Sequence, residues 1–152
     1  MTHTLTIFLL VVVSIWLHEL GHALACRLVG DRLGARRWAL NPLVNLDPVL
    51  SVIVPLGLSL LTGGWLYVGI GRPFLLSRAD WRVIAAGPAV NLLLLVLGLL
   101  GNPDLARVNG VLLVVNLLPV RPLDGWALLH EWREKRELRR MAIERLRETK
   151  PA

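Results

Sequence analysis

Long apolar runs alternate with short polar segments along the chain. Residues 4–17 are predominantly apolar, and this run continues past a short polar motif into a further apolar turn. Residues 48–71 and residues 83–103 contain no charged side chain, and the second of these runs has 21 residues. A helix of about 20 apolar residues is long enough to cross the roughly 30 Å hydrocarbon core of a bilayer. The pattern therefore predicts a membrane protein.

The first half of the chain predicts one long helix followed by less regular structure. The helix is expected over residues 4–29, because Gly30 and a charged pair follow it. Residues 33–47 are too polar to face lipid and contain Asn–Pro and Asp–Pro pairs, so we expect a hairpin or an extended segment lying against the protein. Residues 49–61 are apolar but short and interrupted by proline and glycine. Residues 65–73 can re-enter the membrane only if protein buries their backbone.

The second half predicts two more apolar segments and a charged helix. Residues 79–100 form the clearest membrane span, residues 101–104 a tight turn, and residues 108–120 a last apolar segment. From about His130 the chain favours a charged helix, with Glu131 and Lys135 at i,i+4 spacing, lying in solvent or on the membrane surface.

The expected fold class is an α-helical polytopic membrane protein. It has about three to four transmembrane helices, with a short hairpin or re-entrant segment after the first. Residues 1–130 are expected to form the core and residues 131–152 a charged cytoplasmic tail.

Composition and charge agree with residence in a membrane. Of the 152 residues, 55% are hydrophobic and 18% charged, whereas a soluble domain of this size needs a larger polar shell. The isoelectric point near 11 does not indicate a nucleic-acid partner, because the basic residues lack the aromatic interleaving of such proteins. No Lys or Arg precedes Arg27, so we expect the first apolar run to be retained and not cleaved as a signal peptide. Cys26 is the single cysteine and has no partner for an internal disulfide.

The basic residues that flank the apolar segments predict an orientation. Four arginines between residues 27 and 37 place the end of the first helix in the cytoplasm, and Arg78 and Arg82 place the start of the next span there. The turn at Asn102 then lies outside, and the basic tail lies inside. Residues 49–73 must begin and end on the cytoplasmic side, as a helix paired with a returning loop would.

A histidine–glutamate–histidine motif, HELGH, lies in the first expected helix. His18 and His22 are four residues apart, so both imidazoles stand on one helix face and can bind one zinc ion. Glu19 points into the same cavity and can accept a proton from a water molecule that the metal activates. Gly21 keeps this helix surface low enough for another backbone or a substrate to approach. The alternative is a set of ordinary polar residues at a helix end, but their burial in an apolar membrane helix is costly and favours a functional site.

A catalytic zinc ion needs a third protein ligand, and Asp124 is the candidate. Pro119 and Pro122 break the preceding helix, and Gly125 permits an unusual backbone angle, so the carboxylate can turn inward at membrane depth. Taken alone, the Asp–Gly pair is more typical of a turn at a membrane surface.

Four motifs in this order resemble the site-2 protease family of intramembrane zinc metalloproteases. They are HELGH, residues 41–48 (NPLVNLDP), residues 86–91 (AGPAVN) and residues 116–125 (NLLPVRPLDG), and the similarity covers about residues 15–126. The resemblance implies that one zinc ion is held by His18, His22 and Asp124 and that Glu19 is the catalytic base.

The resemblance also places Asn91 near the active site. Its amide either contacts a substrate carbonyl or oxyanion, or forms a hydrogen bond between helices. Asn116 is expected to bond a ligand residue or the backbone, and Gly87 and Pro88 to permit close helix approach. The chain departs from the family in residues 64–73 (GWLYVGIGRP), which differ from the Gly-Trp-Ala-Lys-Pro type, and we expect no appended regulatory or peptide-binding domain.

The function implied by the resemblance is hydrolysis of peptide bonds in or near transmembrane segments, in the membrane of a prokaryotic cell. The expected partners are a transmembrane protein or peptide substrate and the lipid bilayer, with residues 33–47 offering an edge to an extended substrate. Two alternatives stay open: a non-proteolytic membrane zinc-binding or scaffolding protein, and a zinc hydrolase of a small amide. Another divalent metal could replace zinc. His3 and His130 are expected to be surface residues and not ligands.

Overall fold

The computed structural model describes residues 2–30, 49, 53–61 and 80–148, and every element assigned within these ranges is a helix. The helices are α1 (Thr2–Leu28), α4 (Val54–Leu61), α5 (Trp81–Leu99), α6 (Pro103–Asn116) and α7 (Asp124–Glu148). The hairpin expected at residues 33–47 and the re-entrant segment expected at residues 65–73 lie outside the described residues, and so does the path that joins them.

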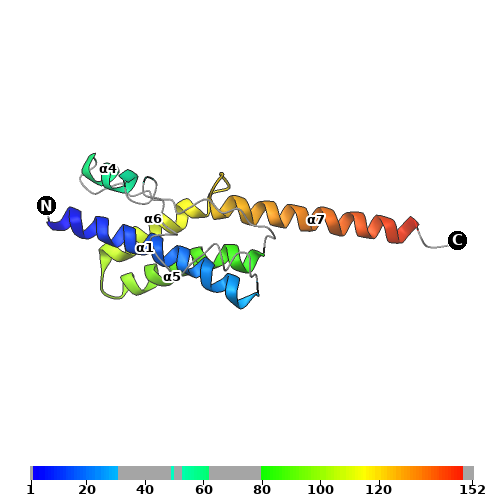
Figure 1. The fold of residues 1–152 in the computed structure, drawn as a ribbon, viewed down its shortest axis with the longest axis horizontal. Coiled ribbons are helices and arrows are strands. Elements are labelled where there is room, and N and C mark those ends of the chain that lie inside the picture. The colour runs from blue at the N-terminus through cyan, green and yellow to red at the C-terminus, as the bar shows by residue number, and fades with distance from the viewer. Residues whose placement is uncertain (1, 31–48, 50–52, 62–79, 149–152) are drawn as a thin grey trace.

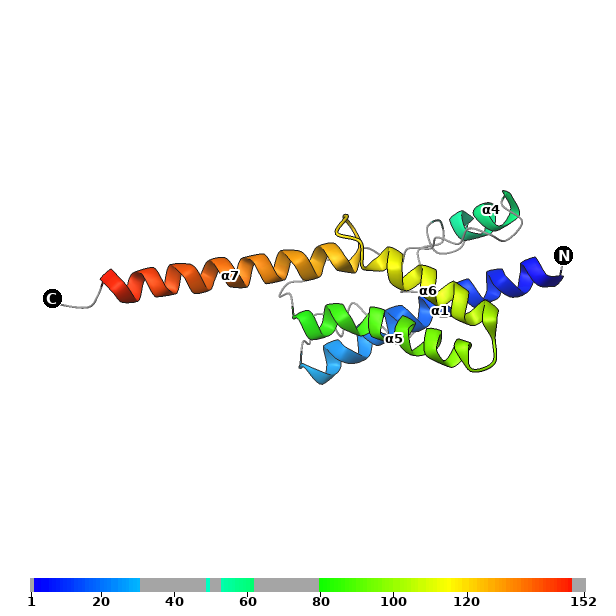
Figure 2. The ribbon, with the colours of Figure 1, turned by 180° about the vertical axis from the view of Figure 1, so that it is seen from behind.

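The helices α1, α5 and α6 pack together as the body of the molecule (Figure 1). α5 packs against both α1 and α6, and α1 also contacts α6. The short helix α4 contacts α1 and lies toward the end of the bundle that holds the N-terminus (Figure 2). α7 contacts α5 and then projects beyond the bundle along the long axis of the molecule, so its C-terminal end lies far from the start of α1.

The connection between α5 and α6 is shorter than the sequence suggested. Residues 101–104 were expected to form a turn, but α6 already begins at Pro103. The expectation is wrong for two of these four residues, because Asn102 caps the helix by accepting a hydrogen bond from Leu105 N at 3.1 Å. Proline at the first helical position has no N–H that needs a partner, and its fixed φ suits a helix.

α7 also begins earlier than the sequence suggested. A charged helix was expected from about His130, whereas α7 starts at Asp124 and is continuous to Glu148. The first two turns are mostly apolar, so the charge pattern that marked the helix in the sequence appears only after them. The ion pair expected between Glu131 and Lys135 is present, with 2.5 Å between Oε1 and Nζ.

The apolar core lies between α1 and its two neighbours. One cluster joins α1 to α6 and consists of Ile7, Val11, Ile15, Val108 and Leu112. A second cluster joins the C-terminal part of α1 to α5 and consists of Ala23, Cys26 and Val83. The residues that α1 contributes to the first cluster are spaced by four, which places them on one face of the helix. α1 therefore packs against α6 with its N-terminal half and against α5 with its C-terminal part.

Two of the described helices are long and apolar enough to cross a membrane. They cover His3–Leu28, with a hydropathy of 1.8, and Trp81–Leu99, with a hydropathy of 1.9. Their outward faces carry exposed apolar side chains, among them Leu5, Leu9, Leu92, Leu93 and Leu97. α6 has only 14 residues, fewer than the ~20 that a full crossing needs. Of the three to four transmembrane helices expected, the described part of the chain contains two that are long and apolar enough to cross a membrane.

Close packing of α5 on α6 can be tested at Gly98. A methyl group on this residue would lie 2.7 Å from Ala106 Cα and 2.9 Å from Ala106 Cβ, so the two helices would have to move apart. We expect Gly98→Ala to lower the free energy of unfolding by about 1–3 kcal/mol, measured by thermal unfolding in detergent with circular dichroism. Gly101→Ala is the matched control, since nothing lies within 4 Å of the added carbon. Equal stability of the two variants would contradict the packing.

Candidate metal centre

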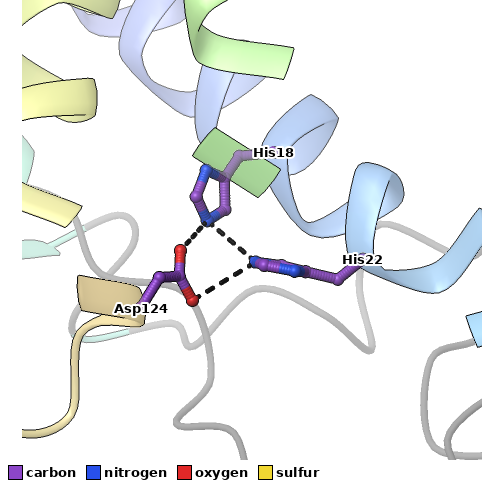
Figure 3. Close-up of side chains that lie close together, drawn as sticks. All are labelled: His18, His22 and Asp124. Atoms are coloured by element: carbon purple, nitrogen blue, oxygen red, sulfur yellow. Dashed lines mark hydrogen bonds and ion pairs between the residues drawn. The ribbon is translucent and has the colours of Figure 1, made fainter. Parts of the chain in front are cut away.

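Three side chains from distant parts of the sequence converge at the contact between α1, α5 and the start of α7. His18 and His22 come from α1 and Asp124 is the first residue of α7, and one ligand atom from each lies within 4.8 Å of the others. His18 Nε2 is 3.1 Å from Asp124 Oδ2, and His22 Nε2 is 3.5 Å from Asp124 Oδ1 (Figure 3). The two Nε2 atoms are 3.1 Å apart. The structure thus brings together the three residues that the sequence analysis named as ligands.

The hydrogen bonds made by the other ring nitrogens orient both imidazoles. His18 Nδ1 lies 2.5 Å from Asn91 Oδ1, and His22 Nδ1 lies 2.8 Å from the carbonyl oxygen of Val83. Each oxygen accepts a hydrogen bond, so each Nδ1 carries the proton and each Nε2 presents a lone pair. A hydrogen-bonded Nδ1 opposite a free Nε2 is the arrangement found in histidines that bind metals.

The spacing of the ligand atoms fits a tetrahedral metal ion. Ligands at about 2.0–2.1 Å from zinc lie about 3.3 Å from one another, and the three measured separations are 3.1, 3.1 and 3.5 Å. Two lone pairs that face each other at this distance repel unless a cation or a proton lies between them. Asp124 Oδ2 is buried and has no hydrogen bond of acceptable geometry. These atoms therefore suit a metal ion, and zinc in particular, because two imidazoles and one carboxylate leave a fourth position open.

Glycines create the space that this arrangement needs. A Cβ atom on Gly87 of α5 would lie 2.6 Å from His18 Nε2 and would also overlap His22 Nε2. A Cβ atom on Gly21 would lie 2.8 Å from the carbonyl oxygen of Ala86. The expectation that Gly21 admits another backbone is confirmed, because α5 is that backbone. Gly87 does more than permit close approach, since its missing side chain leaves open the place where the two Nε2 atoms meet.

The start of α7 brings Asp124 to the histidines. α6 ends at Asn116, and residues 117–123 are not helical. Gly125 lies so close to the carbonyl groups of Leu117 and Leu118 that any Cβ atom would overlap them. Its carboxyl oxygens Oδ2 and Oδ1 lie 3.1 and 3.5 Å from the Nε2 atoms of His18 and His22. A metal ion held there would bind the carboxylate form of this side chain.

Glu19 and Asn91, the two residues named for catalysis, occupy different places. Glu19 is buried on α1 between the two histidines in sequence, and it is not one of the three clustered ligands. Asn91 is fully buried behind the His18 ring and bonds Nδ1, the nitrogen that faces away from the ligand cluster.

The other residues singled out in the sequence lie outside the ligand cluster. His3 forms an exposed ion pair with Asp104 at 3.3 Å, and His130 lies 3.7 Å from Glu134 on the surface of α7. The expectation that these two histidines are surface residues is therefore confirmed. Asn116 is the half-buried last residue of α6. The motif at residues 41–48 and the loop at residues 64–73 lie outside the described residues.

Two buried polar residues next to the site, Ser14 and Asn109, were not predicted from the sequence. Asn109 of α6 is fully buried and bonds both Asn91 and Ser14 of α1. A signal was present, since each is an uncharged polar residue within an apolar helix, and Ser14 precedes His18 by four residues on the same face.

Comparison with known proteins points to zinc metalloproteases. The chain is 29% identical over 153 residues to YwhC of Bacillus subtilis, covering 79% of this chain and 65% of that protein. It is 34% identical over 149 residues to Rip2 of Mycolicibacterium smegmatis, covering 81% of this chain and 57% of the relative. Rip2 of Mycobacterium tuberculosis is 34% identical over 143 residues, covering 77% and 53%. All three are named as candidate zinc metalloproteases.

These similarities are partial in extent. The chain spans between about half and two thirds of the length of these relatives. No protein-family model matches the chain, and no solved structure matches it either.

Removal of a ligand should abolish metal binding. We expect the purified protein to hold one zinc ion per chain and His22→Ala or Asp124→Ala to retain less than about a tenth of it, because two ligands do not form a tight site. The measurement is elemental analysis of protein purified in detergent. His130→Ala is the matched control, since His130 is exposed on α7, and it should keep the full complement of zinc. Retention of zinc by Asp124→Ala would contradict the proposed ligand set.

A side chain at residue 87 should also lower zinc binding, although all three ligand residues remain. The methyl group of Gly87→Ala would overlap the position between the two Nε2 atoms, so we expect zinc content to fall by at least about tenfold. Gly110→Ala is the matched control, because its Cβ would meet only Leu95 Cδ1 at 3.7 Å, an ordinary contact. Full zinc content in Gly87→Ala would show that the ion does not lie there.

Proposed function

We propose that the chain is an intramembrane zinc metalloprotease of the site-2 protease family, a proposal that its similarity to candidate zinc metalloproteases supports. It hydrolyses peptide bonds in or near transmembrane segments of membrane proteins. The observation that carries this proposal is the meeting of His18, His22 and Asp124 within 4.8 Å between apolar helices. Burial of ionisable side chains is costly in a membrane protein, so a buried cluster of them is by default interpreted as a functional site.

His18, His22 and Asp124 hold one zinc ion in this proposal. When bound, the zinc ion acts as a Lewis acid that polarises the substrate carbonyl and acidifies a water molecule. The protein orients the ligands through Asn91 and through the carbonyl group of Val83, which fix the two imidazole rings. Gly87 keeps the adjoining space free of side chains.

Glu19 is the general base and then the general acid. Its carboxylate takes a proton from the water molecule whose oxygen attacks the carbonyl carbon of the scissile bond, and then delivers that proton to the leaving nitrogen as the C–N bond breaks. Its position supports this role, because Glu19 is buried on the same helix as the two histidines and follows His18 directly in sequence. A buried carboxylate beside a metal site, but outside its ligand group, has a role in hydrolysis and none in a purely structural site.

Asn91 is better suited to hold His18 than to contact substrate. Its side-chain oxygen accepts from His18 and its nitrogen donates to Asn109, so both polar atoms already have buried partners. The alternative named from the sequence, contact with a substrate carbonyl or oxyanion, would need one of these interactions to be given up.

The substrate is proposed to be a transmembrane protein or peptide whose cleaved segment unwinds locally, since a helix hides its peptide bonds from attack. The lipid bilayer is the second proposed partner, and it would contact the exposed apolar side chains of α1 and α5. The protein is placed in the membrane of a prokaryotic cell, with the basic end of α7 in the cytoplasm. The edge proposed for substrate binding, residues 33–47, lies outside the described residues.

A non-proteolytic zinc-binding scaffold is the competing function, and Glu19 separates the two. The test is cleavage of a transmembrane reporter peptide in detergent or liposomes by wild type and by Glu19→Gln, which keeps the size of the side chain. We expect the wild type to cleave and Glu19→Gln to be at least about 100-fold slower, while both bind zinc equally.

Each other outcome has a separate meaning. Equal cleavage by the two proteins rejects Glu19 as the base. A wild type that holds zinc but cleaves nothing supports the scaffold. Cleavage of small amides without cleavage of the reporter supports a hydrolase of small amides.

A further inference from the structure

A continuous series of hydrogen bonds leads from His18 of α1 through α5 to α6 and back to α1. Asn91 Oδ1 accepts from His18 Nδ1 at 2.5 Å, and Asn91 Nδ2 donates to Asn109 Oδ1 at 3.0 Å. Asn109 Nδ2 in turn donates to Ser14 Oγ and to the carbonyl oxygen of Leu105, each at 3.0 Å. Ser14, Asn91 and Asn109 are 1%, 0% and 0% exposed, so these three side chains depend on one another for their hydrogen bonds, whereas Leu105 is half-buried.

The direction of this series is fixed at its far end. A backbone carbonyl can only accept, so the oxygen of Leu105 requires the nitrogen of the Asn109 amide to face it. Ser14 imposes no direction, because a hydroxyl both donates and accepts. With its nitrogen committed, Asn109 presents its oxygen to Asn91. Asn91 must then offer its nitrogen to Asn109 and its oxygen to His18.

This direction decides which nitrogen of His18 carries the proton. An oxygen facing Nδ1 keeps the proton on Nδ1 and leaves the Nε2 lone pair for a metal ion. If the Asn91 amide were reversed, its N–H would face Nδ1, the proton would move to Nε2, and Nε2 could not be a ligand. We propose that Asn109 is a positioning residue of the metal centre: through Asn91 it holds His18 in the tautomer that binds metal. The inference rests on the proposed metal site and extends it to a residue that touches no ligand atom.

Two variants, Asn109→Leu and Asn109→Asp, distinguish the positioning role from a purely structural one, because the two roles predict opposite orders of metal affinity for them. Asn109→Leu keeps the side-chain volume and suits an apolar helix contact, but it removes the acceptor that orients Asn91. Asn109→Asp keeps an acceptor for Asn91 and can accept from the Ser14 hydroxyl, but it turns a second oxygen toward the Leu105 carbonyl and buries a charge. If Asn109 serves packing alone, leucine is the better replacement for every property. If it orients Asn91, aspartate is the better replacement for metal binding.

The experiment is a Co²⁺ titration of the metal-free, full-length protein in detergent, followed by the visible absorption bands of the ion. We expect Asn109→Leu to weaken apparent Co²⁺ affinity by about tenfold, the lower end of the range for changes behind a metal ligand. We expect Asn109→Asp to bind nearly as well as wild type, although thermal unfolding should show it to be the less stable of the two. Opposite orders for affinity and stability are the result that a packing role cannot produce.

Two controls isolate the effect. Ser14→Ala removes a partner that sets no direction and should leave Co²⁺ affinity unchanged. Val108→Ala removes two methyl groups from the neighbouring apolar cluster, so it should lower stability without a change in affinity. Wild-type affinity in Asn109→Leu, or weaker binding by Asn109→Asp than by Asn109→Leu, would overturn the positioning role. Failure of the wild type to bind Co²⁺ would instead remove the metal centre itself, whatever the variants do.

Discussion

The fold is organised around the problem of holding two imidazoles and a carboxylate together in a buried, largely apolar interior. In an apolar interior each of these groups loses hydration, and only close partners of complementary charge make up for that loss. His18, His22 and Asp124 are partners for one another, but their ligand atoms face inward at 3.1–3.5 Å, which leaves a position for a cation between them. Every outer polar atom of the two rings is already bonded to α5. The arrangement is a binding site before any ion enters it.

The contact between α1 and α5 has a register that follows from these bonds. Along α1, His18 precedes His22 by four residues, and along α5, Val83 precedes Asn91 by eight, with Gly87 midway. The pairs formed are His22 with Val83 and His18 with Asn91, so the order along one helix is the reverse of the order along the other. A shift of α5 by one turn would separate both pairs and move Gly87 away from the two Nε2 atoms. Small residues at such contacts allow backbones to approach closely in membranes.

Sequence patterns predicted those features that depend on neighbours along one helix. The apolar runs gave α1 and α5 to within two residues at each end, and the spacing of His18 and His22 placed both rings on one face. The pattern along one helix could not predict that Asp124 reaches the two histidines. Its position depends on where α6 ends and on the contact of Gly125 with the carbonyl groups that follow α6. The resemblance to a family supplied what the local pattern left open. Asn109 escaped notice because its role depends on the direction of an amide two contacts away from the ligand, which no spacing encodes.

The shortness of α6 explains how a residue so late in the chain reaches the level of the histidines. At 1.5 Å per residue, the 19 residues of α5 span about 28 Å and the 14 residues of α6 about 21 Å. α6 starts beside the C-terminal end of α5 and runs back along it, so it ends about 7 Å short of where α5 began. That level is close to Gly87, which lies against both histidine rings. A full-length return helix would have carried the chain past the site, whereas the short one releases it where the non-helical residues 117–123 can turn Asp124 inward. The interruption that makes α6 too short to cross a membrane is thus the same feature that completes the metal centre.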